Sequence, residues 1–237
     1  MKIVPSLLLL IAITFLSGCL ATTSPTKQQT RIDEVPMYGG MDRSQIPEIK
    51  AADEKFISDV SAQFGSRERA SMLWVNQGYR FYREDQLGMA MRRFNQAWLL
   101  NPENPEVYAG FGSVLNDQAK HCDAMSMMNK ALSMNPPTFQ GIYTDAGLIT
   151  VLCALRDSSL PPERKTEILA LSETRYKKAE SVEPDKNYLY NSWARAYYWR
   201  GQYQDAWNTI AKQRASGGKP NEQLMKLLMS KMPEPKS

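Results

Sequence analysis

Residues 74–102 read WVNQGYRFYREDQLGMAMRRFNQAWLLNP, and most of this pattern returns 34 residues later in the chain. Gly78 returns as Gly112, and Pro102 returns as Pro136. The other matching pairs are Trp74 and Tyr108, Ala90 and Ala124, Phe94 and Met128, and Ala97 and Ala131. A fixed period of this length indicates a repeat protein, in which each unit buries its apolar face against its neighbours.

The small residues at these repeated positions have a steric role. Two antiparallel helices approach closely only where both present small side chains, so we expect Gly78 to face Ala90. The same contact should recur in the next repeat. Pro102 should end the second helix of its unit, because a proline cannot continue the hydrogen-bond ladder. Each unit is therefore predicted to be a pair of antiparallel helices.

This spacing of glycine, alanine, aromatic and proline positions resembles the tetratricopeptide repeat (TPR) family. The resemblance implies an all-α fold, a right-handed solenoid of about four helix–turn–helix repeats with capping helices at both ends. It places the TPR domain at residues 71–220. The repeats are expected at 71–104, 105–138, 139–186 and 187–220.

The third repeat is expected to be longer than the others. Gly147 and Ser172 occupy its two small positions and are 25 residues apart, whereas the corresponding residues of the first repeat are 12 apart. About 13 residues are therefore inserted, around residues 157–162. The prolines in this insertion predict a loop and then a lengthened second helix that begins near Pro161.

Segments on either side of the repeats have the pattern of capping helices. Residues 47–65 carry apolar side chains at helical spacing, with a proline at the start and Gly65 at the end. Residues 221–232 form a second amphipathic segment, after a fourth repeat in which Gln213 replaces the expected alanine. That departure indicates that no full repeat follows.

The N-terminus is expected to be a lipoprotein signal peptide, residues 1–18. Its short apolar run ends in Leu-Ser-Gly-Cys at residues 16–19, which resembles the lipobox of bacterial lipoproteins. The resemblance implies lipidation of Cys19 and, because Leu20 is not an aspartate, the periplasmic face of the outer membrane. The alternative is an ordinary secretory signal with an incidental cysteine.

Residues 19–46 are expected to form a flexible tether after the lipidated cysteine, because they are rich in Thr, Ser, Gln, Pro and Gly. One apolar interruption lies at residues 37–40, MYGG. It is either a docking peptide or a turn that lies on the folded domain.

Composition and motifs argue against several classes of function. The 29 basic and 25 acidic residues are spread along the chain, so no nucleic-acid footprint is visible. The sole histidine, His121, is not part of a metal-ligand cluster, and no phosphate loop or nucleophile motif occurs. We therefore expect a protein that is not an enzyme and has no cofactor and no metal.

Two cysteines remain in the mature chain besides Cys19. On the repeat alignment, Cys122 begins a second helix and Cys153 ends the following first helix, so both lie at the same end of neighbouring helices. In an oxidising periplasm they either form a disulfide or remain as two buried apolar residues.

The resemblance also implies a binding groove, because the first helices of TPR repeats line a concave surface. The strongest candidates carry aromatic, amide or charged side chains: Tyr79, Tyr82, Arg83, Asn116, Asp117, Asn191, Arg195, Tyr198 and Trp199. The same faces also carry Ser113, Leu148, Val151 and Leu152. The alternative is that Tyr82, Tyr198 and Trp199 pack on neighbouring helices.

These features together favour a non-enzymatic adaptor lipoprotein that binds a protein or peptide in the cell envelope and supports assembly of a pilus or secretion apparatus. Lipoproteins of this plan also recruit peptidoglycan hydrolases or take part in β-barrel assembly. A different class of function is a structural homo-oligomer, in which a second copy fills the groove. The sequence leaves the oligomeric state open.

Overall fold

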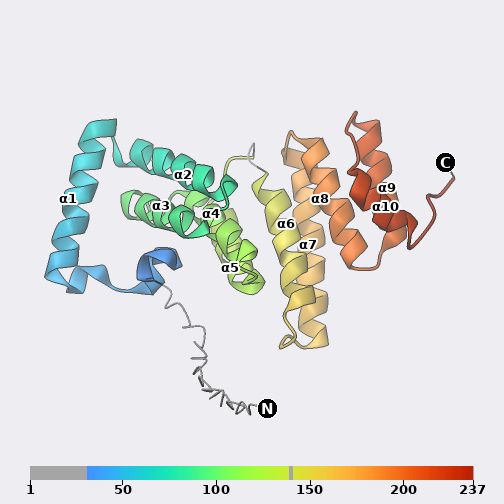
Figure 1. Ribbon diagram of the computed structural model, residues 1–237, viewed down its shortest axis with the longest axis horizontal. Coiled ribbons are helices and arrows are strands. Elements are labelled where there is room, and N and C mark those ends of the chain that lie inside the picture. Colours follow the sequence, from blue (N-terminus) through green and yellow to red (C-terminus); the bar gives the residue numbers. More distant parts are fainter. Residues whose placement is uncertain (1–30, 139–140, 237) are drawn as a thin grey trace, which may run out of the picture. The chain divides into compact units, whose positions relative to one another are not determined.

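The structure is a computed structural model that describes residues 31–138 and 141–236. Within these ranges it contains α-helices and 3-10 helices and no strand (Figure 1). The predicted all-α class is therefore confirmed for the described part of the chain. The expected signal peptide, Cys19 and the start of the tether lie outside the described residues.

Eight of the described α-helices form four successive hairpins. Each hairpin packs its two helices together, and the hairpins contact one another in chain order (Figure 1). Their helices are α2 (Arg67–Arg83) with α3 (Leu87–Leu100), α4 (Pro105–Asp117) with α5 (His121–Ser133), α6 (Ile142–Arg156) with α7 (Pro162–Val182), and α8 (Lys186–Trp199) with α9 (Tyr203–Ala215). The first helices also contact one another, α2 with α4, α4 with α6 and α6 with α8. This row of first helices forms a common face.

The glycine of the first hairpin makes room for an aromatic ring. A Cβ atom on Gly78 would lie 2.5 Å from Cε1 of Phe94, which is closer than real side chains approach. The fully buried ring of Phe94 therefore fills the space beside Gly78. In the second hairpin the predicted pair is in contact, because a Cβ atom on Gly112 would lie 3.2 Å from the carbonyl oxygen of Ala124.

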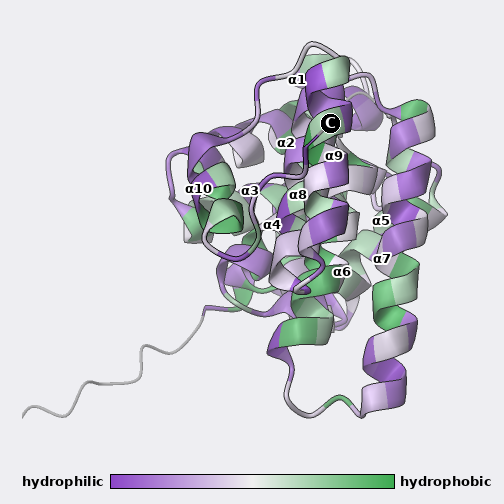
Figure 2. Ribbon diagram, turned by 90° about the vertical axis from the view of Figure 1, so that its right-hand side faces the viewer, coloured by the Kyte–Doolittle hydropathy of each residue, from purple (hydrophilic) through white to green (hydrophobic). Residues whose placement is uncertain are grey.

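The third hairpin keeps the same pairing despite its insertion. Tyr176 follows Gly147 by 29 residues, whereas Phe94 follows Gly78 by 16, and a Cβ on Gly147 would lie 2.9 Å from the Tyr176 ring. Ser172 donates a hydrogen bond to the carbonyl of Gly147 at 2.9 Å. The inserted residues lengthen α6 and α7, which reach past their neighbours at the end that carries the connecting loop (Figures 1 and 2).

Apolar side chains of successive helices are buried together in clusters. One buried cluster runs from α2 to α7, and two smaller clusters continue it from α6 to α10 (Glu222–Met229). At the other end, α1 (Pro47–Phe64) places Val60 against Ala70 and Leu100. Gly65 ends α1 with a left-handed backbone, φ 90°. These terminal helices cover the first and last hairpins.

Gln213 has a structural role at the end of the last hairpin. It is 1% exposed, and its side-chain amide donates to the backbone and side-chain oxygens of Asn187 and to the carbonyl of Lys219. These three acceptors satisfy the NH2 of the side chain, whereas its Oε1 atom is buried without a hydrogen-bond partner.

The prediction of a flexible tether over residues 19–46 is wrong for residues 31–46. These residues form three short 3-10 helices, η1 (Ile32–Glu34), η2 (Pro36–Gly40) and η3 (Arg43–Gln45), that pack on α1 and α3. Asn95 on α3 holds them, because its amide donates to the carbonyls of Asp33 and Val35 at 2.9 and 2.8 Å and accepts from the Tyr38 amide at 3.3 Å. The composition of residues 31–46 indicates few apolar contacts. It does not reveal that Asn95 supplies hydrogen-bond partners for the backbone of this segment.

Candidate functional site

A cavity of about 350 Å³ lies on the face formed by α2, α4, α6 and α8. Its lining combines aromatic rings, carboxylates, amides and aliphatic side chains. It contains Tyr79, Tyr82, Ser113, Asn116, Asp117, Asp145, Leu148, Ile149, Leu152, Tyr188, Arg195 and Trp199. Six of the nine strongest predicted residues are therefore brought together here, together with Ser113, Leu148 and Leu152.

A second cavity of about 220 Å³ continues the first toward α10. Arg195 and Trp199 line both cavities. The remaining lining residues of the second cavity are Asn191, Tyr198, Asn221, Gln223, Leu224 and Leu227. We call the two cavities together the groove, and it includes eight of the nine strongest predicted residues.

Two residues that the sequence placed on this surface lie elsewhere. Arg83 is exposed at the end of α2 and lines neither cavity. Val151 is fully buried and packs in the core cluster with Tyr176 and Trp193. The prediction for Val151 was wrong because its position on α6 lies between the groove face and the core face of the helix. Its side chain points into the core.

Asp145 and Tyr188 line the groove but were not predicted. Both lie at helical spacing from residues that were: Asp145 lies three residues before Leu148, and Tyr188 lies three before Asn191. The helical spacing in the sequence could therefore have identified both residues. The α10 residues of the groove had no such signal, because their helix comes from outside the repeats.

The tyrosines of α2 serve both packing and lining. The ring of Tyr79 meets Phe94 edge to face at 5.1 Å between centroids and also contacts Tyr82 at 6.5 Å. Burial raises the pKa of both phenols, and a hydrogen bond to Asp117 raises the pKa of Tyr82 further. Both tyrosines are partly buried and line the cavity.

Asp145 and Tyr188 form a hydrogen-bonded pair across α6 and α8, with the phenol donating to the carboxylate. Burial raises the pKa of Asp145 to about 7, and the charges of Glu183 and Asp117 add to this while the Tyr188 hydrogen bond opposes it. The ring of Tyr188 lies against Gly141, where a Cβ atom would be only 2.9 Å away. The absence of a side chain at Gly141, with φ 74°, therefore leaves room for the ring.

Glu183 is another carboxylate, besides Asp145, that lies near the start of α6. It is 2% exposed and accepts from the backbone amides of Tyr143 and Thr144, at 2.7 and 3.3 Å, and from the Thr144 hydroxyl. These bonds satisfy amides that have no partner within the helix, and the carboxylate complements the positive end of the helix dipole.

The opposite end of the groove is cationic. The Arg195 guanidinium lies 6.0 Å from the centroid of the Trp199 ring, within reach of a cation–π contact. The groove thus changes from two carboxylates, Asp117 and Asp145, to an arginine near α10.

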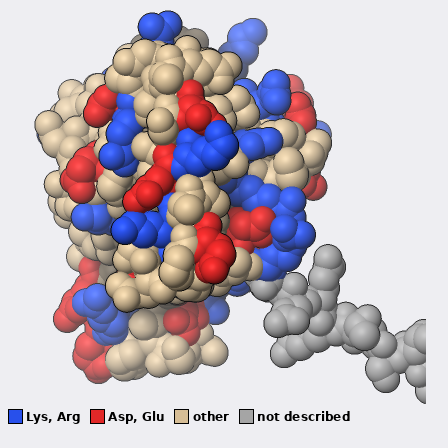
Figure 3. Space-filling model, turned by 90° about the vertical axis from the view of Figure 1, so that its left-hand side faces the viewer, with Lys and Arg blue, Asp and Glu red and all other residues tan. Residues whose placement is uncertain are grey.

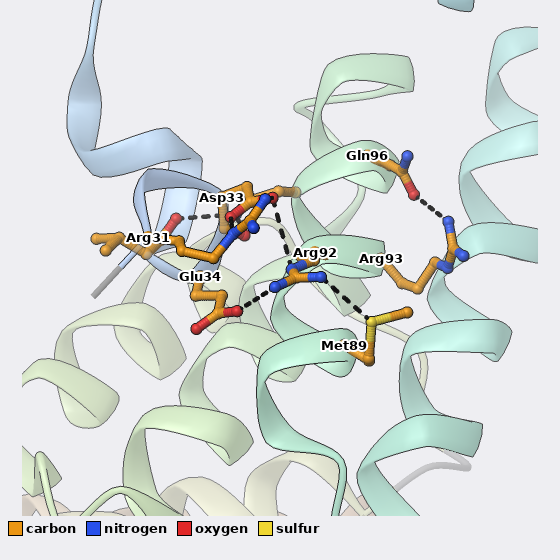
Figure 4. Close-up of polar contacts among 9 residues, drawn as sticks. Arg31, Asp33, Glu34, Met89, Arg92, Arg93 and Gln96 are labelled. Carbon is orange, nitrogen blue, oxygen red and sulfur yellow. Dashed lines mark hydrogen bonds and ion pairs between the residues drawn. The ribbon is translucent and has the colours of Figure 1, made fainter. Parts of the chain in front are cut away.

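A larger cavity of about 710 Å³ lies between η1, η2 and α3 (Figure 4). Arg92 points toward the carboxylates of Asp33 and Glu34, and Arg93 donates to Gln96 at 2.7 Å. The Arg92 contacts join the N-terminal segment to α3, whereas the Arg93 contact lies within α3. Arg92, which lines this cavity, is paired with acidic residues of the same chain. We therefore interpret the cavity as the contact between α3 and residues 31–46.

Cys122 and Cys153 are joined in the structure by a disulfide between the start of α5 and the end of α6, with Cα atoms 4.7 Å apart. Near it, the His121 imidazole lies 3.0 Å from the side-chain oxygen of Asn116. In the described ranges, no three His, Cys, Asp or Glu side chains are arranged to hold a metal ion.

Comparison with family models, curated proteins and solved structures finds no match for this chain. None of the helices described at residues 31–138 and 141–236 combines the length and hydropathy of a membrane span. At the α1 end, basic and acidic side chains are interspersed on the surface without a large patch of one sign (Figure 3). The groove is therefore the feature that supports a function for this chain.

Proposed function

We propose that this chain is a TPR-type adaptor that holds a segment of another protein in the groove and is anchored to the outer membrane through Cys19. The observation that carries the proposal is the groove itself, to which four first helices and α10 each contribute side chains. Tyr, Trp and Arg are the residue types that contribute most binding energy when a surface is covered.

Three features support the repeat assignment. The period of 34 residues recurs in the sequence, each repeat corresponds to one helical hairpin, and the first helices contact one another in order. Each hairpin relies on its neighbours to bury its apolar face, as expected of a solenoid. Assembly of a pilus or secretion apparatus is the pathway that we propose for the adaptor.

Site-specific photo-crosslinking of the full chain in the cells that produce it tests the binding function. A crosslinker at Tyr82 or Trp199 lies in the groove, whereas one at Arg83 is a matched control on the same helix as Tyr82. We expect a foreign envelope protein to be captured from the groove positions and not from the control. Capture of only second copies of this chain would instead establish a structural oligomer.

Fractionation of a Cys19→Ala variant tests the anchor separately. Without the thiol no lipid can be attached, so the variant should leave the membrane fraction and lose its lipid mass. A variant that stays with outer membranes would overturn the lipid anchor while leaving the groove function intact.

A further inference from the structure

Asp117 and Asp145 face the groove without a basic partner. No lysine, arginine or histidine in the described ranges forms an ion pair with either carboxylate. Arg195 lines the same cavity, but its guanidinium lies over Trp199 and forms no ion pair with these acids. The α4–α6 end of the groove thus has two acidic side chains that no basic side chain of the described residues pairs with.

The rest of this cavity matches a long basic side chain. Tyr82 and Tyr188 contribute aromatic rings from α2 and α8, and a cation over the face of such a ring is attracted by it. Leu148, Ile149 and Leu152 supply an aliphatic wall, against which the methylene stem of lysine or arginine packs. An acid pair, aromatic rings and an apolar wall are the three surfaces that such a side chain requires.

We propose that this cavity selects an arginine or lysine side chain of the segment held in the groove, an inference that rests on the proposed adaptor function. The basic head group lies between Asp117 and Asp145, and its stem lies along α6. An acidic segment would bring its charge toward two carboxylates, and an apolar segment would cover them without supplying a counter-charge. A basic side chain avoids both costs.

The protonation state of Asp145 depends on the titratable groups that surround it on the adjoining helices. They are Tyr188 on α8, Asp117 on α4, Tyr79 and Tyr82 on α2, Tyr176 on α7 and Glu183 before α8. All of these are neutral or negative at neutral pH, and Arg195 on α8, which lines the same cavity, lies over Trp199, so the free protein resists ionisation of Asp145. A bound guanidinium or ammonium favours the carboxylate, and its binding should release a proton near pH 7 and weaken as the pH falls below the Asp145 pKa of about 7.

Fluorescence polarisation of the full chain in detergent micelles tests this selection. The probes are three matched pools of short labelled peptides, random except for one central position fixed as Arg, Glu or norleucine. We expect the Arg pool to bind about tenfold more tightly than the norleucine pool and the Glu pool to bind most weakly. Asp117→Asn and Asp145→Asn should each remove most of the preference. Asp59→Asn, an exposed change on α1, is the matched control and should leave it intact.

The outcomes separate this inference from the adaptor function. Equal binding of all three pools that is lost in Tyr82→Ala would overturn the basic selection and retain the groove. Preference for the Glu pool would overturn it as well. Failure of every pool, together with crosslinks only between copies of this chain, would overturn both proposals. Asp117 is exposed, so Asp117→Asn leaves the fold intact and keeps the test decisive if Asp145→Asn alters stability.

Discussion

The ring of Phe94 occupies the space that a side chain on Gly78 would need. A Cβ atom on Gly78 would lie 2.5 Å from the ring, and one on Gly110 would lie even closer to the same carbon. Phe94 on α3 is therefore enclosed between two side-chain-free positions, one on α2 and one on α4. This contact joins the first hairpin to the second, and it sets the spacing of the helices that carry Tyr79 and Tyr82 into the groove.

Gly78→Ala should lower the free energy of unfolding by about 1–3 kcal/mol, because the added methyl group overpacks a fully buried ring. The higher helix propensity of alanine, about 1 kcal/mol, only partly offsets this cost. Denaturant unfolding of the full chain measures the effect. In a Phe94→Leu background the cost should shrink, since the smaller side chain leaves room.

Gly88→Ala provides the matched control for that change. Gly88 is also within a helix, but an added Cβ would approach only the carboxylate end of Glu34, at 3.1 Å. This flexible end can move, so we expect unchanged or slightly higher stability. Equal effects of the two substitutions would show that helix propensity, and not the Phe94 ring, governs position 78.

Asp145→Asn should stabilise the protein above pH 7. The folded state raises the pKa of Asp145 to about 7 from an ordinary 3.8, so ionisation of this group in the native chain costs free energy. Between these two values the unfolded chain is ionised and the folded chain holds the proton, so stability from this group falls as pH rises through that window. Asparagine does not titrate, and its side-chain oxygen can still accept from Tyr188.

Thermal unfolding of wild type and Asp145→Asn over a pH series checks this expectation. The gain should be about 1–2 kcal/mol above pH 7, less than the full pKa shift corresponds to, because the burial of Asp145 is incomplete and the remaining solvent screens its charge. The difference should disappear below the ordinary pKa of 3.8. A constant difference across the whole range would mean that Asp145 has no raised pKa.

Reduction of the Cys122–Cys153 disulfide should lower stability by about 3–4 kcal/mol, because the bond closes a loop with a sequence separation of 31 residues. Unfolding with and without a reducing agent measures this. The double variant Cys122→Ala, Cys153→Ala should not respond to the reductant. Complete alkylation of both cysteines in the unreduced folded protein would contradict the bond.

Asn95→Ala should release residues 31–46 from α3. It removes hydrogen bonds to three backbone groups of this segment, and the buried amide and carbonyl groups left without partners cost about 1–3 kcal/mol each. Hydrogen exchange at Tyr38 should accelerate, whereas exchange in α8 should stay as in wild type. Uniform acceleration along the chain would instead mean that Asn95 supports the whole fold.

Much of the architecture was predictable from local and periodic signals. The hairpin boundaries follow from glycine, alanine and proline positions at a period of 34 residues, because every repeat faces the same steric problem. The groove face of each first helix follows from the helical period, which correctly predicts that Asn116 and Arg195 lie on it. Lengthening of α7 was predictable from the number of inserted residues.

Contacts between distant segments were not predictable in the same way. The docking of residues 31–46 depends on side chains far away in the sequence, such as Asn95, which satisfies backbone groups about 60 residues away, and Arg92, which pairs with Asp33 and Glu34. The apposition of Gly78 and Phe94 depends on which side chain fills a space between helices. The acidic end of the groove depends on Tyr188 from α8 meeting Asp145 from α6.

The sequence by itself determined the helical repeats, their register and the face that each first helix turns to the groove, because these follow from short-range periodicity and sterics. Only the tertiary structure decided which side chains line the groove together, that burial raises the pKa of Asp145, and which segments cover the first and last hairpins. Burial and charge are properties of groups that different helices bring together, and no single segment specifies them.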